Sequence, residues 1–391
     1  MSSKKNARLE ELKGRVPEVT PEEALALVEK GAILVDVREP DEVAQGSPEG
    51  ALRIVRGFLE LRIEEAVEDT DATVLTLCAG GVRSLFAADD LLRLGFTDVR
   101  SIVGGFGGWK ADGLPFEVPQ VLNDEQRERY GRHLLMPEIG EEGQMKLQDS
   151  KVLLLGAGGL GSPAALYLAA AGVGTLGIVD DDVVDRSNLQ RQILHTDRRV
   201  GDPKVESARD TLNALNPAVK IVTYPVRLTA ENVDEILPGY DVVLDGSDNF
   251  PTRYLVNDAC VKHGIPNVHG SIFRFEGQVS VFWPGGETAD GSAGPCYRCV
   301  YPTPPPPELA PSCAEAGVLG VLPGLVGTLE ALETIKLLLG LKRSLVGRLL
   351  AFDALEVRFD EFELVRNPDC PACGDGVTIE EYTSYEESCG I

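Results

Sequence analysis

Basic residues are scarce in this sequence relative to acidic ones. Lys and Arg number 37 against 62 Asp and Glu, which gives a formal net charge of −25 at pH 7. A chain this acidic repels phosphate backbones and anionic membrane surfaces, so we expect neither nucleic acid nor a membrane as its main partner. The charge favours solubility, and it also suits docking onto a basic partner.

Long hydrophobic runs are missing as well. No stretch of roughly 18 uninterrupted apolar residues occurs, which predicts no transmembrane helix. The first residues, MSSKKNARLEELKGR, lack the apolar core of a secretory signal, so we expect a cytoplasmic protein. The most apolar stretch, residues 318–341, contains Glu330, Glu333 and Lys336 at helical spacing, which predicts an amphipathic helix.

Histidine is rare, with 4 residues, and 8 cysteines in 391 residues do not suggest a disulfide scaffold. Four of the cysteines form two CxxC pairs, Cys296 with Cys299 and Cys370 with Cys373. Four thiolates suit a tetrahedral zinc ion and leave no open position, so we predict a structural zinc site. Redox-active dithiols are the alternative for such pairs.

Strand-like and helix-like segments alternate over residues 16–118. The strands AILVDVREP, ATVLTL and DVRSIV and the helix SLFAADDLLRLGF predict a parallel α/β domain that ends in a glycine-rich segment, GGFGGWKADGLPFE. Residues 117–123 contain proline and show no period, which indicates a linker. A second, larger α/β domain is expected over residues 123–391.

The second domain carries a nucleotide-binding pattern. A strand over residues 151–155 runs into Gly156-x-Gly158-x-x-Gly161 and a helix of small residues. The glycines allow the backbone to approach phosphate closely, and the helix N-terminus offers free amides. Asp180 ends the next strand, where an acidic residue commonly holds ribose hydroxyls. Taken alone, this segment favours a dinucleotide dehydrogenase.

The residues that follow favour a triphosphate instead. Asn188 and Arg191 come soon after Asp180, and Lys204 stands at the predicted start of a helix. Cleavage of a triphosphate needs several cations because charge builds up on the leaving group. Asp248 follows the strand YDVVLDG at the carboxyl edge of the sheet, where a carboxylate suits Mg²⁺ that bridges phosphate oxygens. A helix N-cap is the structural alternative for Asp248.

The segment CAGGVRS, from Cys78 to Ser84, lies between a predicted strand and a predicted helix. Gly80 and Gly81 let the backbone curl so that amide hydrogens point at the sulfur, and Arg83 adds a positive charge. Such a cradle stabilises a thiolate or a terminal persulfide. A phosphatase would hold phosphate in a similar loop, but it would also need a nearby acid that the sequence does not place.

Three further cysteines remain. Cys260 lies on a predicted helix and is expected in the core. Cys313, in APSCAEAGVLG, opens an apolar helix, and a helix N-terminus lowers the pKa of a thiol. A buried inert cysteine is the alternative for Cys313. Cys389 belongs to the tail SYEESCGI.

The CAGGVRS loop, with LVDVREP before it and GGFGGW after it, resembles the rhodanese family over about residues 16–118. The resemblance implies that Cys78 carries a persulfide, with Arg83 and the loop backbone as its cradle. The segment AQGSPEGALRI departs from the family pattern, which has a histidine and a proline before GA.

Residues 123–391 resemble the MoeB/ThiF family of adenylyltransferases, relatives of ubiquitin-activating enzymes. The resemblance rests on RYGRHLLMPEIG, GAGGLGS, SNLQRQ, GDPK, DGSDN, CAEAGVLG and both CxxC pairs. By motif position it implies an ATP site made of Gly158, Gly159, Asp180, Ser187, Asn188, Leu189, Gln190, Arg191, Lys204, Asp248 and Asn249, with Mg²⁺ on Asp248. Arg132 would reach the ATP of a second subunit, which implies a homodimer. Cys313 matches a position that takes part in acyl or sulfur transfer in several members.

Together the resemblances indicate a fused adenylyltransferase/sulfurtransferase of the MoeZ type. In related fused enzymes the rhodanese domain usually follows the adenylation domain, whereas in this chain it precedes it. They imply that ATP activates the C-terminal glycine of a ubiquitin-like sulfur carrier that is similar to MoaD or ThiS and ends in Gly-Gly. The persulfide on Cys78, loaded by a donor such as a cysteine desulfurase, would then give a thiocarboxylate. The expected pathway is synthesis of molybdopterin, thiamine or a related product.

Two other functions stay open. In a protein-modifier conjugation system, Cys313 would hold the carrier as a thioester and the rhodanese domain would be a docking module. The intact Cys78 loop argues against this function, because a docking module needs no nucleophile. A dehydrogenase is the weakest alternative, because it leaves Arg191, Lys204 and the paired cysteines unexplained.

Overall fold

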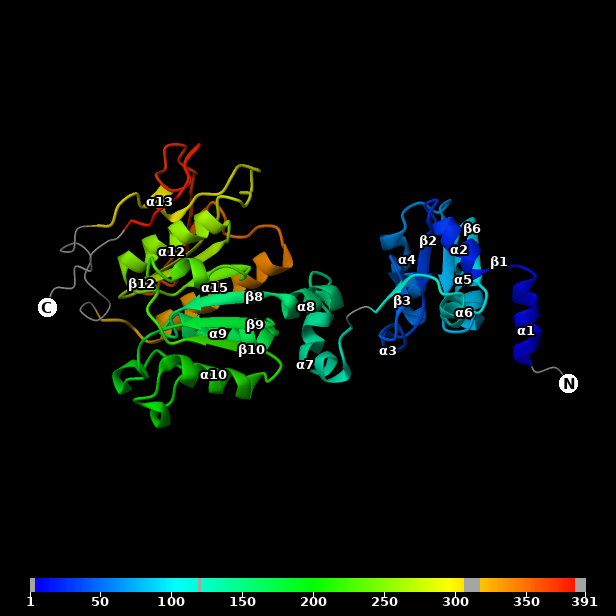
Figure 1. Cartoon of the computed structure of the whole chain (residues 1–391), viewed down its shortest axis with the longest axis horizontal. Helices are drawn as coiled ribbons and strands as arrows, with labels where there is room; N and C mark the ends of the chain where they lie inside the picture. Colours follow the sequence, from blue (N-terminus) through cyan, green and yellow to red (C-terminus); the bar gives the residue numbers. More distant parts are fainter. Residues whose placement is uncertain (1–3, 119–120, 306–316, 384–391) are drawn as a thin grey trace. The chain divides into compact units, whose positions relative to one another are not determined.

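The computed structural model describes residues 4–118, 121–305 and 317–383. The chain divides into two compact units, residues 1–127 and 128–391, and each unit has its own main β-sheet (Figure 1). Among the described residues, no helix combines the length and the apolar character that a membrane crossing requires.

The first unit is built on a parallel sheet of five strands in the order β1-β6-β5-β2-β4. These strands are β1 (Glu18–Val19), β2 (Ile33–Asp36), β4 (Leu52–Arg53), β5 (Thr73–Leu77) and β6 (Asp98–Ile102), and a separate antiparallel pair joins β3 (Ser47–Pro48) to β7 (Phe116–Glu117). The parallel α/β architecture predicted for this unit is confirmed.

Helices cover both faces of this sheet. They are α1 (Lys4–Lys13), α2 (Pro21–Val28), α3 (Pro40–Val43), the 3-10 helix η1 (Arg56–Phe58), α4 (Leu59–Ala66), α5 (Val82–Leu94) and α6 (Gly105–Ala111). Successive strand residues point to opposite faces. Val35 and Val74 therefore join a core with α1, α4 and α5, whereas Leu34 and Leu75 pack with α2 and α6 on the other face.

The glycine-rich segment after β6, for which the sequence predicted no helix, forms helix α6. Its first residue, Gly105, has a φ of 54°, and a Cβ there would lie 2.1 Å from the carbonyl oxygen of Cys78. Phe106 N donates to Cys78 O (2.8 Å) and Gly107 N donates to Ala79 O (3.0 Å). Close packing of α6 on the Cys78 loop thus overrides the low helix propensity of glycine.

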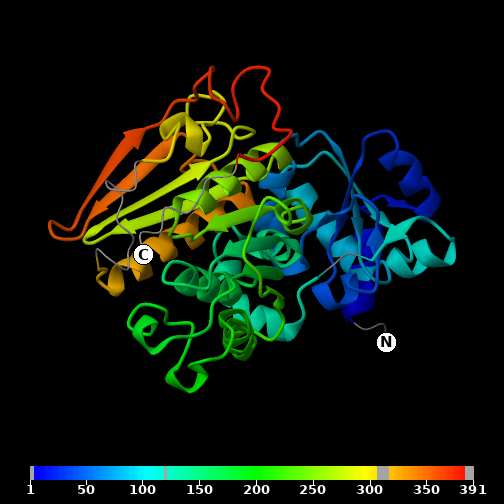
Figure 2. The same cartoon turned by 60° about the vertical axis from the view of Figure 1, so that its left-hand side comes forward.

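The second unit contains an eight-stranded sheet in the order β10-β9-β8-β11-β12-β13-β14-β15. The strands are β8 (Lys151–Leu155), β9 (Thr175–Val179), β10 (Lys220–Tyr224), β11 (Val242–Asp245), β12 (Asn267–Phe273), β13 (Glu276–Phe282), β14 (Arg348–Asp353) and β15 (Arg358–Glu363). The first five strands in this order, β10, β9, β8, β11 and β12, run parallel, as expected of a Rossmann-like domain. The antiparallel strands β13 to β15 extend the sheet (Figure 2).

Helices of the second unit sandwich the parallel part of the sheet. They are α8 (Gly140–Asp149), α9 (Gly161–Ala171), the 3-10 helices η2 (Arg186–Asn188) and η3 (Asp197–Arg199), α10 (Lys204–Leu215), α11 (Val233–Ile236), α12 (Phe250–His263), α13 (Tyr297–Val300) and α15 (Val321–Leu339), while α7 (Asp124–Leu134) crosses the division between the units. Val152 and Leu154 of β8 pack against α9, α10 and α15. Leu153 and Leu155 face α11 and α12 on the other side.

The predicted helix in the apolar stretch is present as α15, but its charges do not form a solvated face. Glu330 and Glu333 are both buried. Glu333 accepts a hydrogen bond from Leu345 N (2.7 Å) and pairs with Lys336. Helix α15 packs on α9 and on β12 and β13, which covers the side that the spacing assigned to water. The amphipathic interpretation was therefore wrong at Glu330 and Glu333.

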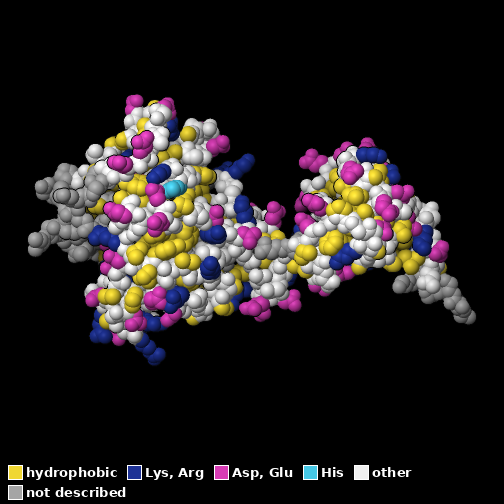
Figure 3. All heavy atoms as spheres, in the orientation of Figure 1, with side chains coloured by type: hydrophobic (Ala, Val, Ile, Leu, Met, Phe, Trp, Pro, Cys, Tyr) yellow, Lys and Arg dark blue, Asp and Glu magenta, His cyan; other side chains and the backbone are white. Residues whose placement is uncertain are grey.

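Acidic side chains are spread over the visible surface of both units rather than gathered in one patch (Figure 3). An even distribution of like charge raises solubility without forming a single docking face. The face shown therefore fits solubility, rather than docking of one partner, as the explanation of the net charge.

Candidate active site

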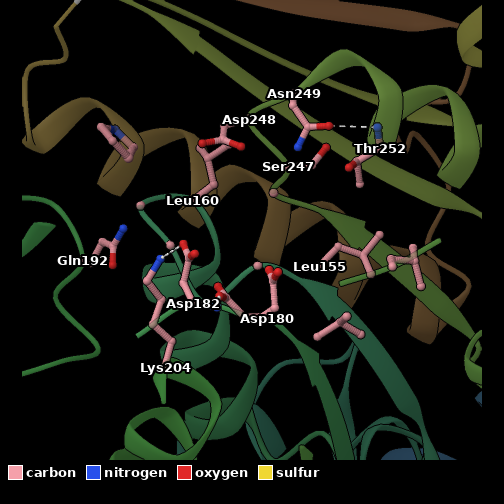
Figure 4. Close-up of a pocket in the computed structure, with 18 of the residues that line it drawn as sticks. Leu155, Leu160, Asp180, Asp182, Gln192, Lys204, Ser247, Asp248, Asn249 and Thr252 are labelled. Atoms are coloured by element: carbon pink, nitrogen blue, oxygen red, sulfur yellow. Dashed lines mark hydrogen bonds and ion pairs between the residues drawn. The ribbon is translucent and has the colours of Figure 1, made fainter. Parts of the chain in front are cut away.

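A cavity of about 450 Å³ opens at the carboxyl ends of β8, β9 and β11 in the second unit (Figure 4). Ligands of doubly wound sheets bind at this edge. Seven of the residues that the sequence assigned to nucleotide binding line the cavity, namely Gly158, Gly159, Asp180, Arg191, Lys204, Asp248 and Asn249. Glycine backbone, cations and carboxylates thus converge on one space large enough for a nucleotide.

The glycine turn between β8 and α9 is fixed by hydrogen bonds to Ala157. Its N–H donates to Asp180 Oδ2 (2.8 Å), and its carbonyl oxygen lies 2.9 Å from His195 Nε2. Burial lowers the pKa of His195, so a neutral ring donates its Nε2–H to this carbonyl. A Cβ on Gly161 would lie 1.9 Å from Gly156 O, so only glycine allows α9 to start this close to the turn.

Lys204 is buried beside the cavity at the first position of α10, as the sequence predicted for the helix start. Its Nζ donates to Asp182 Oδ2 over 2.7 Å (Figure 4). Asp180 lies nearby, and burial raises its pKa although Lys204 opposes the shift. A buried cation with a more exposed carboxylate partner is well placed to meet the charge of a phosphate group.

Asp248 lies on the loop between β11 and α12, and its carboxylate projects into the cavity (Figure 4). The N-cap of α12 is the next residue, Asn249, whose Oδ1 accepts from Thr252 N (2.9 Å). The N-cap alternative for Asp248 is therefore wrong, because the helix starts one residue later. The carboxylate of Asp248 carries no capping bond and can serve a ligand.

The SNLQRQ segment reaches the cavity only in part. Arg191 is on the cavity wall, whereas the four residues before it are not among the lining residues: Ser187, Asn188, Leu189 and Gln190. Asn188 donates from Nδ2 to Ser187 Oγ (3.3 Å) in the 3-10 turn η2. Contact of these four side chains with a nucleotide remains a prediction.

Several lining residues were missed by sequence reasoning. Polar members include Asp182, Gln192 and Arg253. Apolar members such as Leu155, Val179, Val226 and Leu228 make one part of the cavity wall hydrophobic. Asp182 and Gln192 stand next to motifs already noted. Arg253 lies in the first turns of α12, and its position shortly after Asp248 could have indicated that it lines the cavity.

Arg132 lies on α7 and is exposed. It is not among the residues that line the cavity of its own chain. Its expected role is to reach the ATP of a second subunit, and this role stays a prediction.

Cys78 is buried at the end of β5, and its sulfur is held inside the following loop. Gly81 N donates to Sγ over 3.2 Å, and Ser84 Oγ lies 3.5 Å from Sγ. Gly81 has a φ of 87°, and a Cβ there would come within 3.0 Å of Gly104 N. The loop therefore turns an amide hydrogen toward the sulfur, as the glycine pattern predicted.

Arg83 is paired with an acid that the sequence did not place. Its Nη1 donates to Glu42 Oε2 over 2.7 Å, and Glu42 comes from the short helix α3. The hydrogen bond from Arg83 holds the pKa of Glu42 below its usual value. An ionised carboxylate tied to arginine is a poor proton donor, so the loop suits sulfur chemistry better than phosphatase chemistry.

The two CxxC pairs come together, with all four sulfur atoms within 4.8 Å of one another. The Sγ separations are 3.5 Å for Cys296 and Cys370, 3.4 Å for Cys299 and Cys373, and 3.9 Å for Cys296 and Cys299. A tetrahedral zinc ion with Zn–S bonds of about 2.3 Å has sulfur–sulfur edges of about 3.8 Å. The donor set therefore fits zinc, and it leaves no position for water or substrate.

The other cysteines divide into two groups. Cys260 is buried in α12, and burial raises the pKa of its thiol, so the core assignment is confirmed. Cys313 and Cys389 lie outside the described residues.

Comparison with known protein families gives two matches. The model of the ThiF family matches residues 130–372, and that of the rhodanese-like domain matches residues 20–112. Each match contains one of the two sites described above, namely the cavity at the carboxyl ends of β8, β9 and β11 and the Cys78 loop.

Curated proteins match about two thirds of the chain. A protein of Thermus thermophilus named "Sulfur carrier protein adenylyltransferase" is 54% identical over 267 residues, which cover 68% of this chain and 98% of that protein. The "SAMP-activating enzyme E1" of Haloferax volcanii is 52% identical over 271 residues, or 69% and 97% of the two chains. The "Probable adenylyltransferase/sulfurtransferase MoeZ" of Mycobacterium tuberculosis is 49% identical over 275 residues, or 70% and 68%.

Among solved structures, Escherichia coli MccB with ATP matches at a TM-score of 0.54 and 22% identity, covering 65% of this chain and 76% of MccB. The complex of MccB with AMPCPP and MccA gives a TM-score of 0.55 at the same identity and coverage. At this identity the likeness shows the fold alone.

Proposed function

The chain belongs to the ThiF family and carries a rhodanese-like domain ahead of the family region, and from this premise we propose that it activates a ubiquitin-like sulfur carrier with ATP and then supplies the carrier with sulfur. The observation that carries the proposal is that one chain holds both a cavity lined by a glycine turn, cations and carboxylates and a cysteine cradled by a glycine loop. A role in adenylation alone would leave the cradled Cys78 unexplained, and a role in sulfur transfer alone would leave the cavity unexplained.

The first step forms an acyl-adenylate. An oxygen of the carrier's C-terminal glycine carboxylate attacks the α-phosphorus of ATP, the bond to the β-phosphate oxygen breaks, and pyrophosphate leaves. The glycine turn would hold phosphate through its amides, while Lys204 and Arg191 would meet the charge that builds up on the leaving group. Asp248 would hold Mg²⁺, which supplies charge neutralisation to the phosphate oxygens when bound. Asp180 would accept the ribose hydroxyls.

The second step transfers sulfur. A persulfide donor such as a cysteine desulfurase gives its terminal sulfur to the Cys78 thiolate and leaves as a thiol. The terminal sulfur of the Cys78 persulfide then attacks the carrier's activated carbonyl, and AMP leaves. A second thiol attacks the sulfur of Cys78 in the resulting acyl disulfide, so that the carrier departs as a thiocarboxylate and a cysteine disulfide remains. Cys313 is the candidate for this second thiol, and molybdopterin, thiamine or a related compound is the proposed end product.

The two steps separate in one experiment. ATP, Mg²⁺, a persulfide donor and a Gly-Gly-ended carrier are incubated with the chain, while pyrophosphate exchange into ATP and the intact mass of the carrier are followed. We expect exchange, and a carrier mass increased by the difference between sulfur and oxygen. Cys78→Ala should abolish the mass change and keep exchange, whereas Cys260→Ala should keep both. No exchange with any Gly-Gly-ended carrier would contradict the proposal.

A second function has one observation in its favour, the similarity to a protein named SAMP-activating enzyme E1. In that function, Cys313 would hold the carrier as a thioester for transfer to target proteins. A stable adduct between Cys313 and the carrier, without free thiocarboxylate, would favour this second function. Arg132 and a homodimer are proposed in both, because the arginine would complete the site of the partner subunit.

A further inference from the structure

A buried histidine and a buried aspartate lie side by side beneath the loop that carries Asp248. Asp245 ends β11, His269 lies on β12, and the two residues are paired in the register of these strands. His269 Nδ1 lies 3.0 Å from Asp245 Oδ2, and both side chains are almost completely buried. Burial lowers the pKa of His269, so the ring is neutral and its N–H is directed at Asp245.

The other oxygen of Asp245 holds the loop. Asp245 Oδ1 accepts from Ser247 N (3.1 Å) and from Ser247 Oγ (2.5 Å). Burial favours the neutral form, yet the hydrogen bonds from His269 and Ser247 keep the pKa of Asp245 below its usual value. One ionised carboxylate therefore joins the neighbouring strand to the residue that precedes Asp248.

The loop is also held at its other polar atoms. Arg253 Nη2 donates to Ser247 O over 3.1 Å, and Asn249 is bound as the N-cap of α12. Residues on both sides of Asp248 are thus tied to the protein, while the carboxylate of Asp248 projects into the cavity (Figure 4). This arrangement fixes the direction of Asp248 without using its oxygens.

The ring of His269 makes an edge contact with an aromatic side chain that is next in sequence to the cysteine cluster. Tyr297 directly follows Cys296, and its ring centroid lies 5.1 Å from that of His269. Tyr297 N donates to Asn257 Oδ1 (2.7 Å) on α12. The segment that would bind zinc is therefore in contact with the histidine that orients Asp245.

We propose that His269 is a positioning residue for Asp248, acting through Asp245 and Ser247, and that Tyr297 links this arrangement to the four-cysteine cluster. The inference rests on the proposed function, in which Asp248 holds Mg²⁺ against the phosphates of ATP. It adds that the cysteine cluster supports the nucleotide site as well as its own segment. His269, Asp245 and Tyr297 are not among the residues that line the cavity, so they would act on a ligand only through Asp248.

The test compares ATP binding at equilibrium with and without added Mg²⁺, together with the rate of pyrophosphate exchange and the content of bound zinc. His269→Leu removes the N–H that Asp245 accepts. We expect it to lose most of the gain in affinity that Mg²⁺ provides, to lower kcat of exchange about 100-fold, as expected for a catalytic group displaced by about 1 Å, and to leave Mg²⁺-free binding unchanged. A role limited to stability would weaken both kinds of binding together.

Three further variants make the result decisive. His269→Asn places an amide N–H near the position of Nδ1 and should restore part of the Mg²⁺ effect, even if His269→Leu folds poorly. Tyr297→Leu should reduce the effect while bound zinc is retained. His263→Leu is the matched control, because it removes another His–Asp pair, His263 with Asp234 at 2.7 Å, in the same unit and outside the cavity lining.

Failure of the inference and failure of the proposed function look different. If Asp248→Asn loses the Mg²⁺ effect while His269→Leu and His269→Asn keep it, the inference is overturned and the proposed function stands. If Asp248→Asn also keeps the effect, Asp248 does not hold Mg²⁺, and the inference is overturned together with that one assignment. Only loss of pyrophosphate exchange with every Gly-Gly-ended carrier overturns the proposed function itself. An unchanged Mg²⁺ effect in Tyr297→Leu would remove the link to the cysteine cluster.

Discussion

The guanidinium of Arg83 and the carboxylate of Glu42 form an ion pair that closes α3 over the Cys78 loop, with Nη1 and Oε2 2.7 Å apart. Arg38 strengthens this placement, because its Nη1 donates to the carbonyl oxygen of Glu42 (3.2 Å). Arg38 itself is held by Asp36 in a buried pair. Arg83 is thus oriented through Glu42 by Arg38 and Asp36, which belong to the LVDVREP segment.

This pair predicts a pH dependence of stability. The pKa of Glu42 is lowered by the hydrogen bond from Arg83, so the stabilisation is complete above the unfolded value of about 4.3 and is lost as pH falls through the lower folded value. The pair is partly exposed, so we expect about 0.5 kcal/mol at neutral pH. Unfolding of the wild type and Glu42→Gln should differ at pH 7 and converge near the acid limit. A constant difference at all pH values would contradict the prediction.

Gly105 tests the contact between α6 and the Cys78 loop. In Gly105→Ala, the new Cβ would come 2.1 Å from Cys78 O, so the loop must move. We expect loss of persulfide on Cys78, measured by mass after incubation with a donor, while pyrophosphate exchange stays unchanged.

Gly113→Ala is the control for Gly105→Ala. Gly113 also has a positive φ, 68°, but nothing lies within 4 Å of its added Cβ. It should cost about 1 kcal/mol of stability through backbone strain and keep the persulfide. Equal persulfide loss in both variants would show that strain, not the contact, matters.

Lys204 tests the charge of the cavity. Lys204→Ala should lower the rate of pyrophosphate exchange about 100-fold, the usual cost of losing one donor to developing charge. Lys262→Ala removes a pair of the same length, Lys262 Nζ to Asp234 Oδ2 at 2.7 Å, outside the cavity lining. Its exchange rate should equal that of the wild type. An unaffected rate in Lys204→Ala would exclude a role of this cation in the chemistry.

Metal content tests the cysteine cluster. The purified chain and Cys260→Ser should hold one zinc ion per chain, and Cys370→Ser should hold none. Because loss of a structural zinc removes binding free energy from the folded state, the unfolding midpoint of Cys370→Ser should fall clearly below that of Cys260→Ser. Zinc measured in Cys370→Ser at the wild-type level would contradict the assignment.

Local signals in the sequence were enough for much of the fold and for part of the candidate site. The glycine pattern after residues 151–155, the start of α10 at Lys204 and the Cys78 loop depend on residues a few positions apart. The CxxC pairs are farther apart, but their thiol chemistry indicated that they meet. These features could be predicted because glycine, lysine and cysteine each have few uses in such positions.

The errors arose where packing overrides a local pattern. Glu330 and Glu333 have the spacing of a solvated face, yet α15 is covered on that side. The segment after β6 has the glycine content of a loop, yet its close contact with Cys78 makes it the helix α6. At Asp248 only the N-cap alternative failed, because Asn249 takes that position, and the role of Asp248 as a Mg²⁺ ligand stays a prediction.

The sequence by itself determined two α/β domains, a glycine turn at the start of a helix, a cradled thiol and a four-cysteine set, because each is encoded in neighbouring residues or in the chemistry of one residue type. Only the tertiary structure decided that Glu42 holds Arg83, that Asp182 holds Lys204 and that His269 supports the Asp248 loop. The hydrogen-bonded partners lie from 22 to 41 positions apart, and their meeting depends on how strands and helices pack, which no local pattern records.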